Sequence, residues 1–135
     1  MALRAFDRGD YSGATTLATE LLTLAERYRG DWFYGNAVHH GHLILGRVAL
    51  ASGNADTARR ELLAAGRTPG SPQLDSWGPN MELALEMIRA GQHEAVLEYF
   101  ELCRSFWGMG HARLDAWASL VADRREPEFG GNLFY

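Results

Sequence analysis

The chain has 135 residues, of which 47% are hydrophobic and 22% are charged, a balance typical of one globular domain that buries its own core. Its formal net charge is −4 and its basic residues are spread out, so it lacks the basic stripe of a nucleic-acid-binding surface. Cys103 is the only cysteine, which excludes an internal disulfide, and because neither a signal peptide nor a long apolar run is visible we expect a cytoplasmic protein with no membrane partner.

Apolar residues at helical spacing predict helices along most of the chain, separated by segments rich in glycine and proline. In the second expected helix, an apolar stripe is formed by Leu17, Leu21, Leu24 and Tyr28. Pro79 suits the first turn of a later helix. We expect helices over residues 2–8, 12–29, 33–51, 55–65, 79–90, 93–107 and 111–123, a loop over 66–78 and an irregular aromatic tail over 125–135.

Three stretches share one pattern: the end of an apolar helix, then a glycine and a polar residue, then a small or β-branched residue five positions after the glycine. Such a glycine adopts the left-handed conformation that ends a helix, the polar residue can cap the next helix, and the small residue lets the two helices approach closely. The pattern therefore predicts three helical hairpins. The glycines are Gly9, Gly53 and Gly91, the residues five positions later are Ala14, Ala58 and Val96, and those four further on are Ala18, Leu62 and Phe100.

This pattern resembles the tetratricopeptide repeat (TPR), a helix–turn–helix unit of about 34 residues. The pair Leu45-Gly46 matches the family's Leu-Gly pair, and Val96 with Phe100 matches its Ala-x-x-x-aromatic pattern. Over roughly residues 3–107, the resemblance implies an all-α fold: a TPR-like right-handed α-solenoid of about three helical hairpins, more widely spaced than in the family. The expected organisation is one domain over 1–124, ended by a capping helix at 111–123, and a tail over 125–135 that packs on the domain or on a partner.

Three histidines lie within four positions of the expected helix 33–51, and helical spacing divides them between two faces. His39 and His42 share one face. They either pack against a neighbouring helix, each ring satisfied by one hydrogen bond, or form a metal-binding pair. A metal site needs a third ligand, which no spacing in the sequence requires, so we predict that there is no metal site. The acids that could supply that ligand are Asp31, Asp75 and Glu82.

In the TPR family, the other face of this helix lines the concave groove where ligands lie. His40 is there either a solvent-facing polar residue or a groove residue that binds a ligand or acts as a general base, since an imidazole titrates near neutral pH. With Asn36 and Arg47 it would form a line of donors suited to a carboxylate or an amide. Arg47 could instead form a structural ion pair. The residues of this face are Asn36, His40, Leu43, Arg47 and Leu50.

The segment 65–81 is unusual because a long loop inside a compact repeat is uncommon without a purpose. The residues in it of the kind that contact a ligand are Asp75, Ser76, Trp77 and Asn80. In the alternative interpretation, the segment is a linker that packs Leu74 and Trp77 on the core while Asp75 or Ser76 helps to cap the next helix.

By resemblance, we expect a binding module that holds a peptide, a partner segment or a small ligand in its concave groove without a cofactor. The alternative is a small metal-independent biosynthetic enzyme, such as a hydrolase or cyclase, in which His40 or His39 is the base and Asp75 or Asn80 orients it or the substrate. Self-association as a homodimer through the aromatic tail is a third alternative. All 13 basic residues are arginine, which favours a GC-rich bacterial source. The candidate ligand-binding residues are Asn36, His40, Leu43, Arg47, Asp75, Trp77, Asn80 and Met81.

Overall fold

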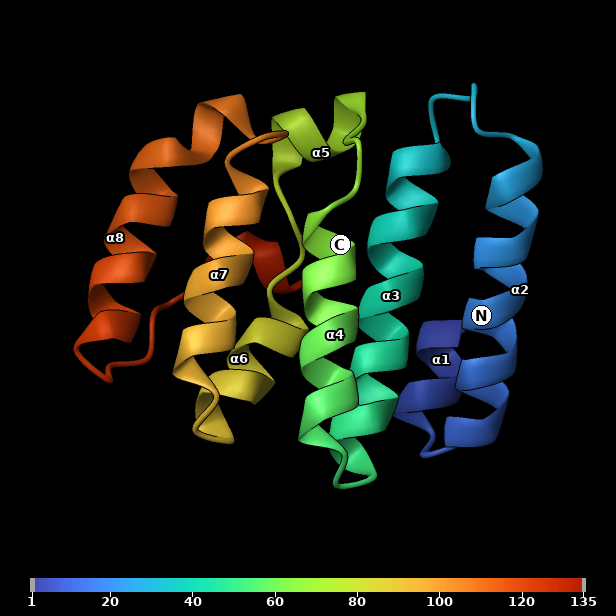
Figure 1. Ribbon diagram of the computed structural model, residues 1–135, viewed down its shortest axis with the longest axis horizontal. Helices are drawn as coiled ribbons and strands as arrows, with labels where there is room; N and C mark the ends of the chain where they lie inside the picture. Colours follow the sequence, from blue (N-terminus) through green and yellow to red (C-terminus); the bar gives the residue numbers. More distant parts are fainter. Residues whose placement is uncertain (1, 135) are drawn as a thin grey trace.

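The computed structural model describes residues 2–134, with side chains from residue 5 onward. This range contains helices, turns and loops but no strand, so the all-α class expected from the sequence is confirmed (Figure 1). None of the helices in this range combines the length and apolar character that a membrane crossing requires. The helices are α1 (Ala2–Asp7), α2 (Tyr11–Arg27), α3 (Tyr34–Ala51), α4 (Ala55–Gly66), α5 (Pro72–Trp77), α6 (Glu82–Arg89), α7 (His93–Cys103) and α8 (His111–Ala122), with short 3-10 helices η1 (Gly108–Gly110) and η2 (Gly130–Leu133).

The long helices stand side by side in pairs (Figure 1). Helix α1 packs against α2, α3 against α4 and α6 against α7, and α8 then packs against α7. Neighbouring pairs meet where α2 contacts α3, α3 contacts α6 and α4 contacts α7. The row of helices therefore runs from α2 at one end to α8 at the other.

The three predicted hairpin turns share one backbone geometry. Gly9, Gly53 and Gly91 have φ angles of 76°, 81° and 81°, the left-handed conformation that ends a helix. Each glycine N–H donates to the carbonyl three residues earlier, and the N–H of the next residue donates to the carbonyl five residues earlier. The side chains of Asp10 and Asn54 then accept hydrogen bonds from the first turn of the following helix. The turns are therefore built as the sequence indicated.

A fourth turn of the same kind follows α8, at a position that has no glycine to predict it. Arg124 has φ 61° and is the only non-glycine residue with a positive φ in the described range. Its N–H donates to Val121 O at 3.0 Å, and the N–H of Arg125 donates to Leu120 O at 2.8 Å. Helix α8 thus ends as α1, α3 and α6 end, like the first helix of a further hairpin.

The residues expected at the hairpin contacts form the core. Ala14, Ala58 and Val96, and the residues one turn later, Ala18, Leu62 and Phe100, have no exposed area. Gly46, from the TPR-like pair, allows α3 and α6 to approach closely, because a Cβ added to it would lie 2.4 Å from Leu83 Cδ2. Packing between these helices therefore follows the small residues that the sequence places on their contact faces.

The segment 66–78 is not a continuous loop, and the sequence-based expectation is wrong there. Its second half forms α5, with Pro72 in the first turn and Ser71 as the cap, since Ser71 Oγ accepts from Leu74 N–H at 3.0 Å. Helix α6 also starts later than expected, at Glu82. The preceding Asn80 accepts from Glu82 N–H at 2.8 Å, and this side-chain turn replaces the first helical residues.

The tail turns back from α8 and packs on the domain (Figure 1). Phe129 is buried, with its ring 4.9 Å from that of Trp117. Asn132 is also buried, and its Nδ2 donates to Pro79 O at 2.9 Å and to Trp77 O at 3.2 Å. The backbone carbonyl of Asn132 accepts a hydrogen bond from the backbone N–H of Met81, just before α6. The described part of the tail is therefore tied to the connection between α5 and α6.

The turn geometry predicts opposite effects for two reciprocal substitutions. Gly53→Ala should lower the free energy of unfolding by about 1 kcal/mol, because an L-residue is strained at this φ and a Cβ there meets nothing within 4 Å. Arg124→Gly should raise it by up to about 1 kcal/mol, because glycine relieves the same strain. Urea denaturation measures both changes.

Arg124→Gly also removes an exposed ion pair in which Arg124 Nη2 lies 2.9 Å from a Glu94 carboxylate oxygen. The control is Glu94→Gln, which weakens that ion pair without changing the backbone. A variant Arg124→Gly that is less stable than Glu94→Gln would show that this turn stores no strain.

Candidate functional site

His39 is a buried structural residue. Its Nε2 accepts the Asn80 N–H at 3.0 Å, so the ring proton lies on Nδ1, which donates to Ala65 O at 3.2 Å. The ring stacks on Tyr99 with centroids 6.5 Å apart. Burial lowers the pKa of His39 to about 3, so the ring stays neutral. Because both nitrogens are already bonded within the protein, His39 is corrected from candidate base to packing residue.

His42 lies toward the partner helix of the same hairpin. Its Nδ1 is 2.6 Å from Glu61 Oε2 on α4, and both side chains are half-buried. His39 and His42 therefore have different partners and do not converge on one ligand. In the described part of the chain, no group of three or more His, Cys, Asp or Glu side chains is arranged to hold a metal ion.

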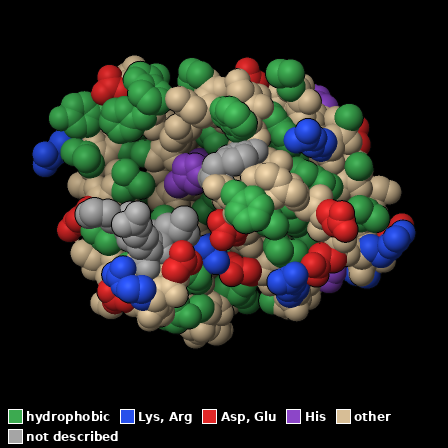
Figure 2. All heavy atoms as spheres, turned by 180° about the vertical axis from the view of Figure 1, so that it is seen from behind, with side chains coloured by type: hydrophobic (Ala, Val, Ile, Leu, Met, Phe, Trp, Pro, Cys, Tyr) green, Lys and Arg blue, Asp and Glu red, His purple; other side chains and the backbone are tan. Residues whose placement is uncertain are grey.

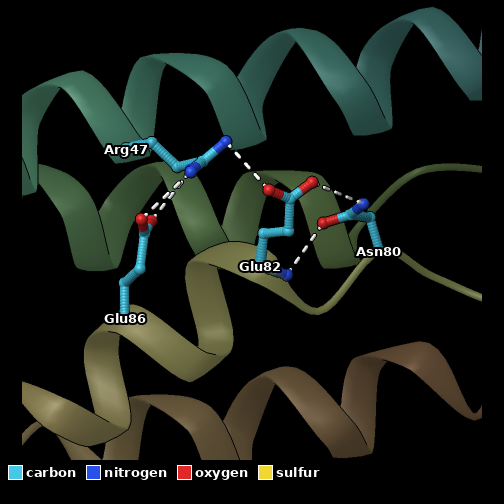
Figure 3. A network of polar contacts seen from close by, with 4 residues as sticks. All are labelled: Arg47, Asn80, Glu82 and Glu86. Atoms are coloured by element: carbon cyan, nitrogen blue, oxygen red, sulfur yellow. Dashed lines mark hydrogen bonds and ion pairs between the residues drawn. The ribbon is translucent and has the colours of Figure 1, made fainter. Parts of the chain in front are cut away.

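Arg47 forms a structural ion-pair network rather than a groove wall. Its Nε and Nη2 donate to the two carboxylate oxygens of Glu86, at 2.9 and 3.1 Å, and Nη1 lies 3.1 Å from Glu82 Oε2 (Figure 3). The guanidinium also lies 4.2 Å from the ring centroid of Phe6 on α1. Arg47 is thus occupied by α6 and α1, and we correct its assignment as a ligand-binding residue.

Asn80 is another buried connector. Its Nδ2 donates to Glu82 Oε1 at 3.3 Å, next to the Arg47 network (Figure 3). Its backbone carbonyl accepts a hydrogen bond from the Tyr99 hydroxyl at 2.8 Å. With the bond from its N–H to His39, Asn80 links α3, α6 and α7 and presents little surface to a ligand.

Three further candidates are also placed away from a ligand site. Leu43 and Met81 are buried in the hydrophobic core, so they do not line an open groove. Asp75 is exposed on α5, where its Oδ1 accepts from Gly108 N–H at 3.2 Å. It holds η1 and is absent from the pocket described next.

The remaining candidates meet at one pocket of about 420 Å³ between α3 and α5. Asn36 and His40 line it from α3, and Trp77, 64% exposed, lines it from the end of α5. Among the described residues, no hydrogen-bond partner is found for the ring nitrogens of His40. Its ring contacts the ring of His39, with centroids 5.1 Å apart. Burial lowers the pKa of His40 below its ordinary value. Gln73, Leu74 and Gly78 complete the described lining.

The pocket depends on how closely α5 approaches the start of α3. Gly35 makes this possible, because a Cβ there would lie 1.8 Å from Gly70 O. Thr68 Oγ1 donates to Gly35 O at 2.6 Å, and the Ser71 hydroxyl donates to Asn36 Oδ1. These supporting residues were not predicted from the sequence. The Ser71-Pro72 pair was a readable helix-start signal, but nothing local pairs residues 35 and 70.

Comparisons of the chain with protein-family models, with curated proteins and with solved structures gave no match. The chemistry of the pocket therefore rests on its own residues. Apart from His40, its described lining carries no ionisable side chain, and it combines an indole face, an aliphatic side chain and two carboxamides. Such a lining suits an uncharged, planar group that can hydrogen-bond to an imidazole.

The buried neutral His39 predicts a specific loss of stability in acid. Its folded-state pKa of about 3 lies below its ordinary value of 6.5, so the unfolded chain binds a proton that the folded chain does not. The contribution is complete above pH 6.5 and is lost as pH falls toward 3, with a slope of up to about 1.4 kcal/mol per pH unit. Denaturation curves measured between these pH values give the free energy of unfolding at each pH. This free energy should rise less steeply with pH for His39→Gln, whose amide can donate and accept in place of the ring.

The matched control is His111→Gln, which replaces an exposed histidine. It tests the effect of a histidine-to-glutamine change outside the core. Equal slopes for His39→Gln and the unsubstituted chain would contradict the neutral, doubly bonded state of His39.

Proposed function

We propose that the chain is a TPR-like interaction module, a short right-handed solenoid that binds an extended partner segment on the face of α3 and α5. Two features support the TPR-like part: the same turn geometry recurs in three helix pairs, and α1, α3 and α6 contact one another in sequence order. In this proposal, the pocket receives one uncharged aromatic or amide side chain of the partner, and no cofactor takes part.

The observation that carries this proposal is the imidazole of His40 beside the exposed indole of Trp77. Polar groups that are largely buried are usually hydrogen-bonded within the protein, yet no partner among the described residues binds the ring nitrogens of His40, so in this proposal they bond to the ligand. A neutral imidazole offers one donor and one acceptor, and the indole offers a flat apolar surface. Together they select a planar group that carries its own hydrogen-bonding atoms.

The enzymatic alternative has less support at the same pocket. A histidine base is normally oriented by a third group such as a carboxylate. None of the described lining residues is acidic, and Asp75, the carboxylate expected for this role, holds Gly108 instead. Recognition therefore uses more of the pocket's features than base catalysis does.

A displayed library of short random peptides, selected against the full chain, tests the proposal. The retained sequences should share an aromatic or amide residue at one position. The residues next to that position in the peptide should be uncharged. For a retained peptide, His40→Ala and Trp77→Ala should each weaken binding at least about tenfold, or about 1.4 kcal/mol. Fluorescence anisotropy of the labelled peptide measures the change.

The control is His42→Ala, which removes the contact with Glu61 and should lower the free energy of unfolding by about 1 kcal/mol while leaving peptide affinity unchanged. Retention of no peptide, or retention that neither His40→Ala nor Trp77→Ala weakens, would refute the assignment of the pocket.

A further inference from the structure

Within residues 2–134, helix α1 lies beside only part of the helix with which it pairs. It has 6 residues, whereas α2 has 17, so at 1.5 Å per residue their lengths are about 9 and about 25 Å. From the turn at Gly9, α1 runs back beside the first turns of α2 only (Figure 1).

The uncovered part of α2 carries the apolar stripe recognised in the sequence. Leu17 and Leu21 are half-buried, whereas Leu24 and Tyr28 are 47% and 48% exposed. Just beyond the helix, Trp32 is 64% exposed. From behind, hydrophobic side chains gather over the end of the molecule formed by α2 and α3 (Figure 2). A hydrophobic stripe of this regularity is typical of a helix that packs against another helix.

Two unpaired charges run along one edge of this stripe. Glu20 and Arg27 are exposed and two helical turns apart, so they lie on the same face of α2, on either side of Leu24 along the axis. Neither forms an ion pair with a described residue. A partner helix on the stripe would therefore meet an acid at one point and a base two turns later.

We propose that this stripe is a dimer interface, on which α2 of a second copy of the chain packs antiparallel to α2. In such a pair, Leu21 of one copy meets Leu24 of the other, and Leu17 meets Tyr28. The same alignment brings Glu20 of each copy to within two residues of the level of Arg27 in the other copy, along the same edge of the interface. The interface repeats identically across a two-fold axis, as a closed homodimer requires.

The charge pattern is what identifies the second copy as the occupant. The helix that fits must carry an acidic residue two turns before a basic one when it runs antiparallel to α2, and α2 itself has this order. In antiparallel helix pairs, residues that flank the apolar seam form the ion pairs that set partner and orientation. A single helix pair buries little area, so the dimer is expected to be weak.

Sedimentation equilibrium of the full chain at protein concentrations up to about 1 mM tests the proposal. The unsubstituted chain should show a reversible monomer–dimer equilibrium. Glu20→Arg and Arg27→Glu should each weaken dimerisation at least about tenfold, because each places like charges together at both symmetric contacts. Since both positions are exposed, circular dichroism should show the fold unchanged.

The decisive measurement is a mixture of the two variants. One then carries two bases and the other two acids, so a mixed dimer regains both ion pairs and should be about as stable as the dimer of the unsubstituted chain. Glu128→Arg, which changes an exposed acid elsewhere by the same charge, is the control and should leave dimerisation unaltered. A monomer at every concentration, or a mixture that stays as weak as its components, would overturn the proposal. Dimerisation that both single variants retain would place the interface on another surface and overturn it equally.

Discussion

The two hydrogen bonds of His39 hold the centre of the molecule together. One ring nitrogen binds the end of α4 and the other binds the connection before α6, while the face of the ring stacks on Tyr99 of α7. A single neutral side chain thus links helices from two hairpins. Protonation would turn the accepting nitrogen into a donor facing a backbone N–H, so the arrangement requires the uncharged ring.

The pocket depends on this central contact because His40 follows His39 in the chain. With His39 fixed inside, the next residue of α3 points about 100° away, toward α5. The bond from Asn80 to His39 also fixes the connection between α5 and α6, and Asn132 of the tail binds the same connection. Both walls of the pocket are therefore positioned by buried hydrogen bonds, which limits how far they can move.

The sequence was most informative where the structure is determined locally. The glycine turns, their caps and the small residues that follow are short-range signals, and the structure contains all three turns. The division of the histidines between two faces of one helix is also a local property, and it separates His39 from His40 correctly. The TPR-like solenoid and the function remain proposals, because helix existence alone does not determine how hairpins stack.

The site was less predictable because it depends on contacts between distant residues. Arg47 and Leu43 share a helical face with His40, yet α6 and α1 cover that face toward its C-terminal end. Helical spacing reveals which residues share a face but not how far a neighbouring helix extends over it. Likewise, the short helix α5 was not predicted because its segment contains prolines. Its packing near Gly35 depends on the close approach of Gly35 and Gly70, which no periodic pattern in the sequence indicates.

The two ends of the row of helices differ in surface chemistry. At one end, α2 presents leucine and tyrosine, whereas the outward residues of α8 include Arg113, Asp115 and Ser119, all exposed. Head-to-tail stacking into filaments would require each end to fit the other, and the exposed side chains of α8 are small, polar or charged rather than a second stripe of large apolar residues. Unlike ends of this kind favour a closed two-fold pair over open head-to-tail stacking.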